Sequence, residues 1–192
     1  MQIKNNMTYY NFIGIYDNAL PNEQCQIIID EFEDNKHQQV VGRSGGGVKP
    51  HVKKSTDIGY HITDDSKSTK IISSSLEKYI EKYKKNYPEV DKLSAWKFSE
   101  VYNVQRYKPK EGYYKPHCEV VGMNGKENRV LVWMYYLNDL ENGGTKFTNY
   151  NMVVHAKKGR LVIWPAYWTH THCGVISNTQ TKYIATGWYT FK

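Results

Sequence analysis

The chain has few of the residues that mark specialised classes of protein. Its 192 residues include three cysteines, an odd number without C-x-x-C spacing, which offers no disulfide framework and argues against a cysteine-rich zinc site. No apolar run approaches the ~20 residues that a membrane-spanning helix needs. The polar stretch Met1–Asn6 is not followed by the apolar core of a signal peptide, and the sequence has no internal repeat, low-complexity segment or linker. We therefore expect one soluble domain over residues 1–192, without a membrane partner, in the reducing cytoplasm.

The composition is that of a globular protein with a basic surface. Hydrophobic residues make up 40% and charged residues 23% of the chain, and its 17 tyrosines favour strands. The net charge of +7 would suit acidic small molecules, acidic peptides or nucleic acid. Much of the excess lies in the lysine-rich stretch Lys67–Lys85, however, and a solubilising surface is the simpler explanation.

Two strands and two helices are expected in the first half of the chain. Aromatic and apolar residues predict strands over Thr8–Tyr16 and Lys54–Ile62. The helical spacing of apolar residues predicts helices over Pro21–Asp34 and Asp65–Tyr87. Between them, the glycine-rich loop Gly42–Pro50 cannot hold regular structure alone, so it is either a floppy connection or a lid over a site.

Short apolar or alternating runs, separated by turn signals, follow from Trp96 onward. They predict about seven strands, over Lys97–Tyr107, Arg129–Leu137, Thr145–Tyr150, Met152–His155, Arg160–Trp164, Thr169–Val175 and Thr181–Phe191. Many short strands at regular spacing are typical of a barrel or jelly roll, whose outside the two helices would brace. The expected fold is therefore mainly β with bracing helices (α+β), with helical support over roughly residues 18–90 and a β core over roughly residues 96–191.

The most informative residues are His117 and Glu119. On a strand, residues two apart point to the same face, so this imidazole and this carboxylate could bind one metal from one side. A second imidazole from a distant strand would complete a 2-His-1-carboxylate set, which leaves positions open for oxygen and substrate and is typical of Fe(II) oxygenases. On its own, a His-x-Glu pair more often marks an exposed strand with two polar side chains.

Two downstream histidines, His170 and His172, could be the distal ligand, because they alternate with threonines and would share one face of a strand. A turn near Ser177–Gln180 should fold this strand back as a hairpin. That hairpin would place Lys182 about 10 Å from His172, which fits better than its separation from His170. Lys182 lies on an otherwise apolar, inward-facing side of its strand, where an ammonium needs an anion partner. We therefore expect Lys182 to hold the far end of a short dicarboxylate whose near end chelates the metal.

Several short motifs accompany these residues along the chain. They are Val104-Gln105-Arg106-Tyr107, Tyr113-Tyr114-Lys115-Pro116-His117, Tyr135-Tyr136-Leu137-Asn138-Asp139, Gly143-Gly144-Thr145-Lys146-Phe147, Lys158-Gly159-Arg160-Leu161-Val162-Ile163-Trp164, the His172 to Lys182 spacing and Gly187-Trp188. Their shared order resembles that of the 2-oxoglutarate- and Fe(II)-dependent dioxygenases, in particular the prolyl 4-hydroxylase-like branch. The resemblance covers most of the chain and is densest over Phe98–Phe191.

The resemblance implies a double-stranded β-helix (jelly roll) core with the two N-terminal helices packed on its outside. It also implies that His117, Glu119 and His172 bind Fe(II). Lys182 would bind the distal carboxylate of 2-oxoglutarate with help from the Tyr136 hydroxyl, and Tyr107 and Trp188 would line the pocket. Such enzymes consume O2, convert 2-oxoglutarate to succinate and CO2, and hydroxylate an unactivated C–H. Ascorbate can serve them as a reductant.

One position departs from the pattern of this branch, which carries His-x-Asp where this chain has Glu119. Glutamate can also coordinate a metal, and its side chain is one methylene longer than that of aspartate. Cys118 and Cys173 each follow a proposed ligand and, by strand alternation, should point away from the metal. The alternative is a zinc site in which these thiols join His170 or His155.

Three functions remain as hypotheses. The first is hydroxylation of a prolyl or other side chain in a peptide or protein, with Gly42–Pro50 as a lid over the substrate. The second is demethylation of nucleic acid, which the basic charge allows, although Lys182-Tyr183-Ile184 stands where the repair branch has an arginine-rich segment. The third is a jelly-roll binding module that has lost catalysis.

Overall fold

The structure, a computed structural model, describes residues 2–4, 7–45, 47–120 and 129–192. Its helices are α1 (Asn22–Asp34) and α2 (Lys67–Asn86), with 3₁₀ helices at Lys36–Gln38, Pro88–Lys92, Thr148–Tyr150 and Trp168–His170. Its strands are β1 (Gln2–Lys4), β2 (Met7–Tyr10), β3 (Ile13–Tyr16), β4 (Val40–Val41), β5 (Thr56–His61), β6 (Trp96–Phe98), β7 (Val101–Tyr107), β8 (Arg129–Tyr136), β9 (Gly144–Phe147), β10 (Met152–His155), β11 (Leu161–Pro165), β12 (His172–Val175) and β13 (Lys182–Phe191). No described helix is long and apolar enough to cross a membrane.

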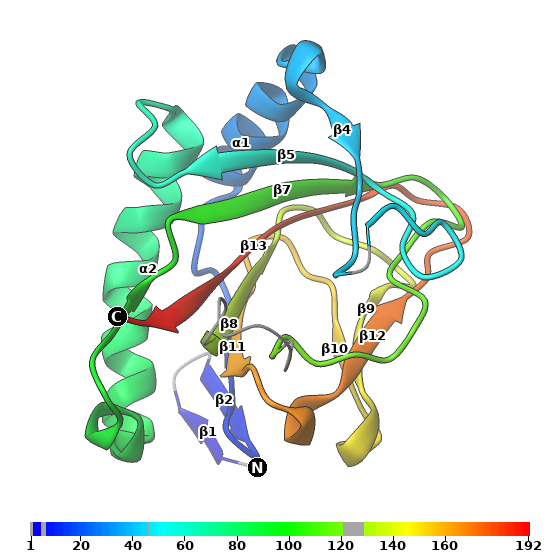
Figure 1. The fold of residues 1–192 in the computed structure, drawn as a ribbon. Coiled ribbons are helices and arrows are strands. Elements are labelled where there is room, and N and C mark those ends of the chain that lie inside the picture. Colours follow the sequence, from blue (N-terminus) through cyan, green and yellow to red (C-terminus); the bar gives the residue numbers. More distant parts are fainter. Residues whose placement is uncertain (1, 5–6, 46, 121–128) are drawn as a thin grey trace.

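The strands form two sheets that lie against each other (Figure 1). The large sheet has the order β1-β2-β3-β11-β8-β13-β7-β5-β4, with β6 paired to β13, and the small sheet has the order β10-β9-β12. Between the sheets, Val132 and Met134 of β8 belong to the same buried cluster as Phe147 of β9 and Val154 of β10. This mainly β arrangement with two helices agrees with the expected fold class.

The two helices contact the other face of the large sheet (Figure 1). Ile28 of α1 and Leu76 of α2 pack in one buried cluster with Leu131, Trp133 and Tyr135 of β8. Because successive residues of a strand point to opposite faces, β8 is buried on both sides, which explains its continuous apolar sequence. The helix boundaries predicted from the sequence agree with the structure to within two residues at each end.

Four of the predicted strands are broken or shortened in the structure, and one of them, Thr145–Tyr150, ends at Phe147 and continues as a 3₁₀ helix. Thr8–Tyr16 contains both β2 and β3, because Asn11 and Phe12 have positive φ angles of 47° and 65° and form the two-residue turn of a hairpin. Lys97–Tyr107 contains both β6 and β7, which pair with different parts of β13. The range Thr169–Val175 begins in a 3₁₀ helix, and its strand starts only at His172. None of these breaks contains the glycine or proline that would signal it in the sequence.

The glycine-rich loop Gly42–Pro50 is fixed at its start and folded on itself in the described part; Gly46 lies outside the described residues. The Gly42 amide donates to the Ser55 carbonyl at 2.9 Å, and Ser44 and Gly47 exchange two backbone hydrogen bonds of 2.9 and 2.8 Å. A Cβ on Gly42 would lie 1.9 Å from the Ser55 hydroxyl oxygen, so the close approach of these two segments requires glycine.

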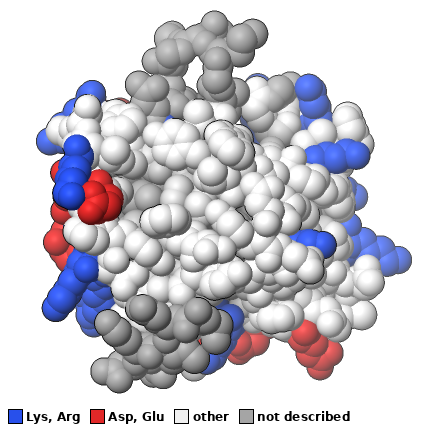
Figure 2. Space-filling view, turned by 90° about the horizontal axis from the view of Figure 1, so that it is seen from below, with Lys and Arg blue, Asp and Glu red and all other residues white. Residues whose placement is uncertain are grey.

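The basic excess is unevenly spread over the surface. Figure 2 shows one face on which the described lysines and arginines lie mainly at the rim, while uncharged residues fill the centre. Many of the lysines belong to α2, as the sequence predicts. This face therefore carries no continuous basic stripe in its described part, as a nucleic-acid track would need.

Candidate metal centre and active site

The triad residues come from two segments that lie side by side. His117 and His172 form an isolated antiparallel bridge in which each backbone amide donates to the other residue's carbonyl at 2.9 Å. Glu119 is fixed two residues further along, where its amide donates to the Ala166 carbonyl at 2.9 Å. The backbone thus sets the relative positions of the three side chains before any metal is bound.

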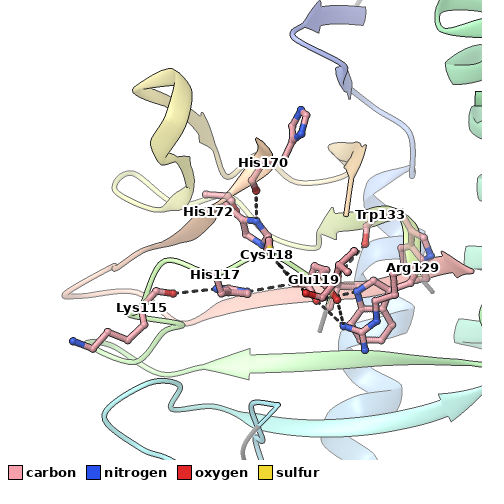
Figure 3. A network of polar contacts seen from close by, with 12 residues as sticks. Lys115, His117, Cys118, Glu119, Arg129, Trp133, His170 and His172 are labelled. Atoms are coloured by element: carbon pink, nitrogen blue, oxygen red, sulfur yellow. Dashed lines mark hydrogen bonds and ion pairs between the residues drawn. The ribbon is translucent and has the colours of Figure 1, made fainter. Parts of the chain in front are cut away.

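The side chains of His117, Glu119 and His172 point toward one another (Figure 3). Glu119 Oε1 lies 3.3 Å from His117 Nε2 and 3.5 Å from His172 Nε2, and one ligand atom of each residue lies within 4.8 Å of the others. Three ligands at right angles around one ion, each ~2.1 Å from it, would be separated by ~3 Å. The donor set and its spacing therefore fit a transition metal bound from one side.

Backbone carbonyls fix the tautomers of both histidines. His117 Nδ1 lies 3.0 Å from the Lys115 carbonyl oxygen, and His172 Nδ1 lies 2.9 Å from the His170 carbonyl oxygen. Since a carbonyl only accepts, each Nδ1 carries a hydrogen, so Nε2 is the atom that can present a lone pair to a metal at the centre of the triad when the ring is neutral. This is the usual way in which an outer partner orients a metal-binding histidine.

Glu119 uses its two carboxylate oxygens differently. Oε1 faces the histidines, whereas Oε2 accepts hydrogen bonds from Arg129 Nη1 at 2.8 Å and Trp188 Nε1 at 3.0 Å. The Arg129 guanidinium also lies 3.6 Å above the Trp188 ring centroid. Burial alone would raise the pKa of Glu119, but in the metal-free protein the hydrogen bonds and charges of His117 and His172, with both rings protonated, hold this pKa well below its usual range. Glu119 is therefore ionised, and Oε1 is the oxygen that it can offer to a metal.

The triad lies in the wall of a cavity of about 410 Å³ that also contains Lys182. Lys182 is 7% exposed, and its Nζ lies 4.7 Å from the Tyr107 ring centroid. Burial lowers the pKa of Lys182 to about 8, against the opposing effect of the nearby Cys173 thiol. No carboxylate of the described residues forms an ion pair with Lys182, so this cation is available to an acidic ligand.

The expected hairpin between the strand of His172 and the strand of Lys182 is wrong. β12 pairs with β9 in the small sheet, whereas β13 pairs with β7 and β8 in the large sheet. Lys182 therefore faces the triad from the opposite sheet. The lysine and the triad share one cavity although β12 and β13 are not hydrogen-bonded to each other. The prediction that the side of β13 bearing Lys182 faces inward is confirmed, since Ile184, Thr186 and Trp188 also line the cavity.

His170 does not belong to the triad. Its Nε2 lies 2.8 Å from the Asn11 carbonyl oxygen, and its ring points away from the other two histidines (Figure 3). Within the described ranges, the triad is the only group of His, Cys, Asp and Glu side chains close enough together to hold a metal. Cys118 and Cys173 line the cavity without joining such a group, so the zinc alternative with His170 or His155 finds no support.

Tyr136 is placed differently from the role that the resemblance implied. Its hydroxyl donates to Thr145 Oγ1 at 2.7 Å and lies 3.2 Å from the Val154 carbonyl oxygen. Thr145 lines the cavity, but Tyr136 is not among the lining residues. Tyr107 and Trp188 do line the cavity, at the Lys182 end and beside Glu119 respectively.

Sequence reasoning missed three features of the site. Arg129 binds Glu119, Tyr113 stacks on the His117 ring at 3.6 Å between centroids, and Lys53 forms a buried ion pair of 2.6 Å with Asp57. Arg129 carries a weak signal, a charge at the head of a continuous apolar run. Lys53 carries none, since it stands in a polar stretch beside Lys54.

Known proteins resemble this chain in sequence profile and in fold. The sequence profile of the 2OG-Fe(II) oxygenase superfamily matches residues 102–190. Similar solved structures include the viral collagen prolyl hydroxylase of Paramecium Bursaria Chlorella virus-1 in its 2OG complex, with a TM-score of 0.69, 17% identity, and coverage of 95% of this chain and 97% of that one. A prolyl-4-hydroxylase of Pseudomonas putida has a TM-score of 0.69 and 11% identity, with coverage of 94% and 92%.

A prolyl hydroxylase of Trichoplax adhaerens, solved with a peptide fragment of the hypoxia inducible factor oxygen degradation domain, has a TM-score of 0.70 and 17% identity, with coverage of 94% and 84%. No curated protein sequence matches the chain. At these identities the structural likeness establishes the jelly-roll fold. The region that matches the superfamily profile, residues 102–190, contains the whole triad and Lys182.

Proposed function

We propose that the chain is an Fe(II)- and 2-oxoglutarate-dependent oxygenase that hydroxylates a prolyl or other side chain of a peptide or protein and releases succinate and CO2. The observation that carries the proposal is the pairing, in one cavity, of an open-faced His-Glu-His triad with a buried lysine that has no carboxylate partner among the described residues. The triad suits a metal and the lysine suits the far carboxylate of a diacid.

Each residue has a defined task in this proposal. His117, Glu119 and His172 would hold Fe(II), which when bound supplies the oxidising chemistry for C–H hydroxylation. Lys182 would bind the distal carboxylate of 2-oxoglutarate, and Thr145, held by the Tyr136 hydroxyl, would line the same pocket. The longer side chain of Glu119 is accommodated because Arg129 and Trp188 bind its second oxygen.

Two observations support a peptide or protein as substrate. The similar Trichoplax enzyme was solved with a peptide fragment. In addition, Val40, Val41, Arg43, Ser44 and Gly45 line the cavity, so the segment that leads into the glycine-rich loop borders the site. Exposed Val40 and Val41 would offer an extended chain an apolar edge, and the loop Gly42–Pro50 would close over it.

The decisive test is the visible charge-transfer band of the Fe(II)–2-oxoglutarate chelate under anaerobic conditions. We expect the band in the wild type, its loss in His172→Ala, and a much higher 2-oxoglutarate requirement in Lys182→Ala. Lys146→Ala, an exposed lysine on β9, is the matched control and should behave as the wild type.

Substrate class is tested by succinate release with proline-rich peptides, free amino acids and single-stranded DNA. Stimulation by peptides supports the proposal, whereas stimulation by DNA alone would instead identify a nucleic-acid demethylase. Absence of the band in metal-replete protein would leave a binding module without catalysis.

A further inference from the structure

A buried chain of polar side chains runs along the cavity wall from Lys53 to Tyr107. Lys53 Nζ donates to Asp57 Oδ2 at 2.6 Å, and Gln105 Nε2 donates to the same oxygen at 3.3 Å. The Tyr107 hydroxyl donates to Gln105 Oε1 at 2.6 Å. Each of these four residues is at most 7% exposed, and all of them line the cavity. We call Lys53, Asp57 and Gln105 the relay.

The relay extends directly to the proposed co-substrate anchor. Gln105 and Tyr107 lie on β7, and the register of the large sheet pairs Gln105 with Asp57 on one side and Tyr107 with Lys182 on the other. Lys182 Nζ lies over the Tyr107 ring, 4.7 Å from its centroid. The relay and the anchor are therefore cross-strand neighbours on one inward-facing surface.

The donors and acceptors of the relay permit one hydrogen-bond direction. The Asp57 carboxylate can only accept, and it already accepts from Lys53 and from Ser55 Oγ at 2.7 Å. Gln105 must therefore turn its amide nitrogen toward Asp57 and its oxygen toward Tyr107. An amide oxygen can only accept, so the Tyr107 hydroxyl must give its single hydrogen to Gln105.

This direction decides what Tyr107 can offer to a ligand. With its hydrogen held by Gln105, the hydroxyl oxygen keeps only lone pairs, one of which faces the Ser55 side chain, and lone pairs repel a carboxylate. Burial raises the pKa of Tyr107 well above its ordinary value, so the hydroxyl stays protonated and the direction does not change at neutral pH. Recognition of an anion at this end of the cavity is left to the ammonium of Lys182.

We propose that Lys53, Asp57 and Gln105 are positioning residues that orient the hydroxyl hydrogen of Tyr107 toward Gln105 and away from the co-substrate. Lys182, and not Tyr107, then binds the carboxylate of 2-oxoglutarate. This inference rests on the proposed function, since it concerns the same co-substrate. It assigns the relay a role in anion recognition, although no member of the relay touches the anion.

A double-mutant cycle on 2-oxoglutarate affinity tests the direction. The dissociation constant is measured anaerobically with Mn(II) in place of Fe(II), from the quenching of tryptophan fluorescence, since Trp164 and Trp188 line the cavity. The four proteins are the wild type, Tyr107→Phe, Gln105→Leu and the double variant. Phenylalanine keeps the ring below Lys182 and removes only the hydroxyl. Leucine at 105 removes the acceptor and leaves Asp57 bound by Lys53 and Ser55.

We expect Tyr107→Phe to change the dissociation constant less than twofold in the wild-type background. In the Gln105→Leu background the released hydroxyl can donate to the carboxylate, so the same substitution should weaken binding by about tenfold, the usual effect of one hydrogen bond to a charged group. A residue that served only packing would give equal effects in both backgrounds.

The inference is overturned if Tyr107→Phe weakens binding more than threefold in the wild type, or if its effects in the two backgrounds differ less than threefold. If Gln105→Leu does not fold, the double substitution Lys53→Met with Asp57→Asn, which leaves the net charge unchanged, provides the second background. An asparagine amide can both donate and accept, so it no longer forces the orientation of Gln105. Wild-type protein that binds Mn(II) but no 2-oxoglutarate would sink the proposed function along with this inference. If the wild type binds 2-oxoglutarate but the effect of Tyr107→Phe is the same in both backgrounds, only this inference is overturned.

Discussion

The two carboxylate oxygens of Glu119 show how a single side chain can be fitted to a site by its neighbours. Oε1 faces the two histidines, and Oε2 is bound by Arg129 and Trp188. A glutamate is longer and more mobile than an aspartate, and the two donors remove that freedom by holding one oxygen outside the triad. The departure from His-x-Asp is therefore matched by contacts that hold the longer side chain in place.

Under the proposed function, the buried lysine would make co-substrate binding sensitive to alkaline pH. Burial lowers the pKa of Lys182 to about 8, so the free protein loses the ammonium as the pH rises through this value. Only the protonated form attracts a carboxylate, and the dissociation constant of 2-oxoglutarate should therefore rise above about pH 8 with a slope approaching tenfold per pH unit. Affinity measured between about pH 7 and pH 9.5 checks this.

Lys182→Arg is the control for that titration, because a guanidinium stays protonated over the whole range. Its affinity should be nearly constant with pH. An equal loss of affinity in the wild type and in the Lys182→Arg variant would assign the titration to another group.

At the scale of elements, the small sheet positions His172 through β9, and β9 depends on one glycine. Gly144 has a φ angle of +150°, and a Cβ there would lie 2.2 Å from the Val154 carbonyl oxygen on β10. We expect Gly144→Ala to lower the free energy of unfolding by about 2–4 kcal/mol, since the clash is with backbone and cannot be relieved by a rotamer change. Urea denaturation measures the loss.

Gly45→Ala is the matched control, because no atom lies within 4 Å of a Cβ at Gly45 and its φ is not positive. Its unfolding free energy should stay within about 0.5 kcal/mol of the wild type. If the two variants were equally stable, Gly144 would not be under steric constraint.

Helices and strands with a strong periodic pattern could be predicted from the sequence. Which strands pair with each other in the sheets could not. The apolar spacing of Asp65–Tyr87 locates α2, and the continuous apolar run Arg129–Leu137 locates β8. The expected hairpin after His172 is wrong because a turn signal shows that the chain reverses but not which sheet the next strand joins. His172 and Lys182 do line one cavity, although the geometric reason for pairing them was not the real one.

At the scale of the whole molecule, a bound metal would tie together segments that are distant in sequence. His117 and Glu119 lie more than 50 residues before His172, and the triad should not persist in the unfolded chain. Mn(II) at about 100 times its dissociation constant should therefore add ~2.7 kcal/mol to the stability, or roughly 5–10 °C in Tm. Thermal denaturation with and without Mn(II) measures the shift.

The shift should vanish in His172→Ala and in Glu119→Ala, and it should persist in His155→Ala, which removes an exposed histidine outside the triad. A full shift in the triad variants would show that Mn(II) stabilises the protein from another site.

Under the proposed function, the facing arrangement of the two sheets would limit the length of the co-substrate that fits the cavity. His172 stands on the small sheet and Lys182 on the large one, so the span between metal and ammonium follows the thickness of the sandwich, ~10 Å where sheets pack face to face. Met134 and Trp164 line the cavity between the two sheets. A diacid that is one carbon shorter would not reach the ammonium, and a diacid that is one carbon longer would have to bend. Larger or smaller side chains at Met134 and Trp164, with the triad and Lys182 unchanged, should therefore alter the chain length of the oxo-diacid that the cavity accepts.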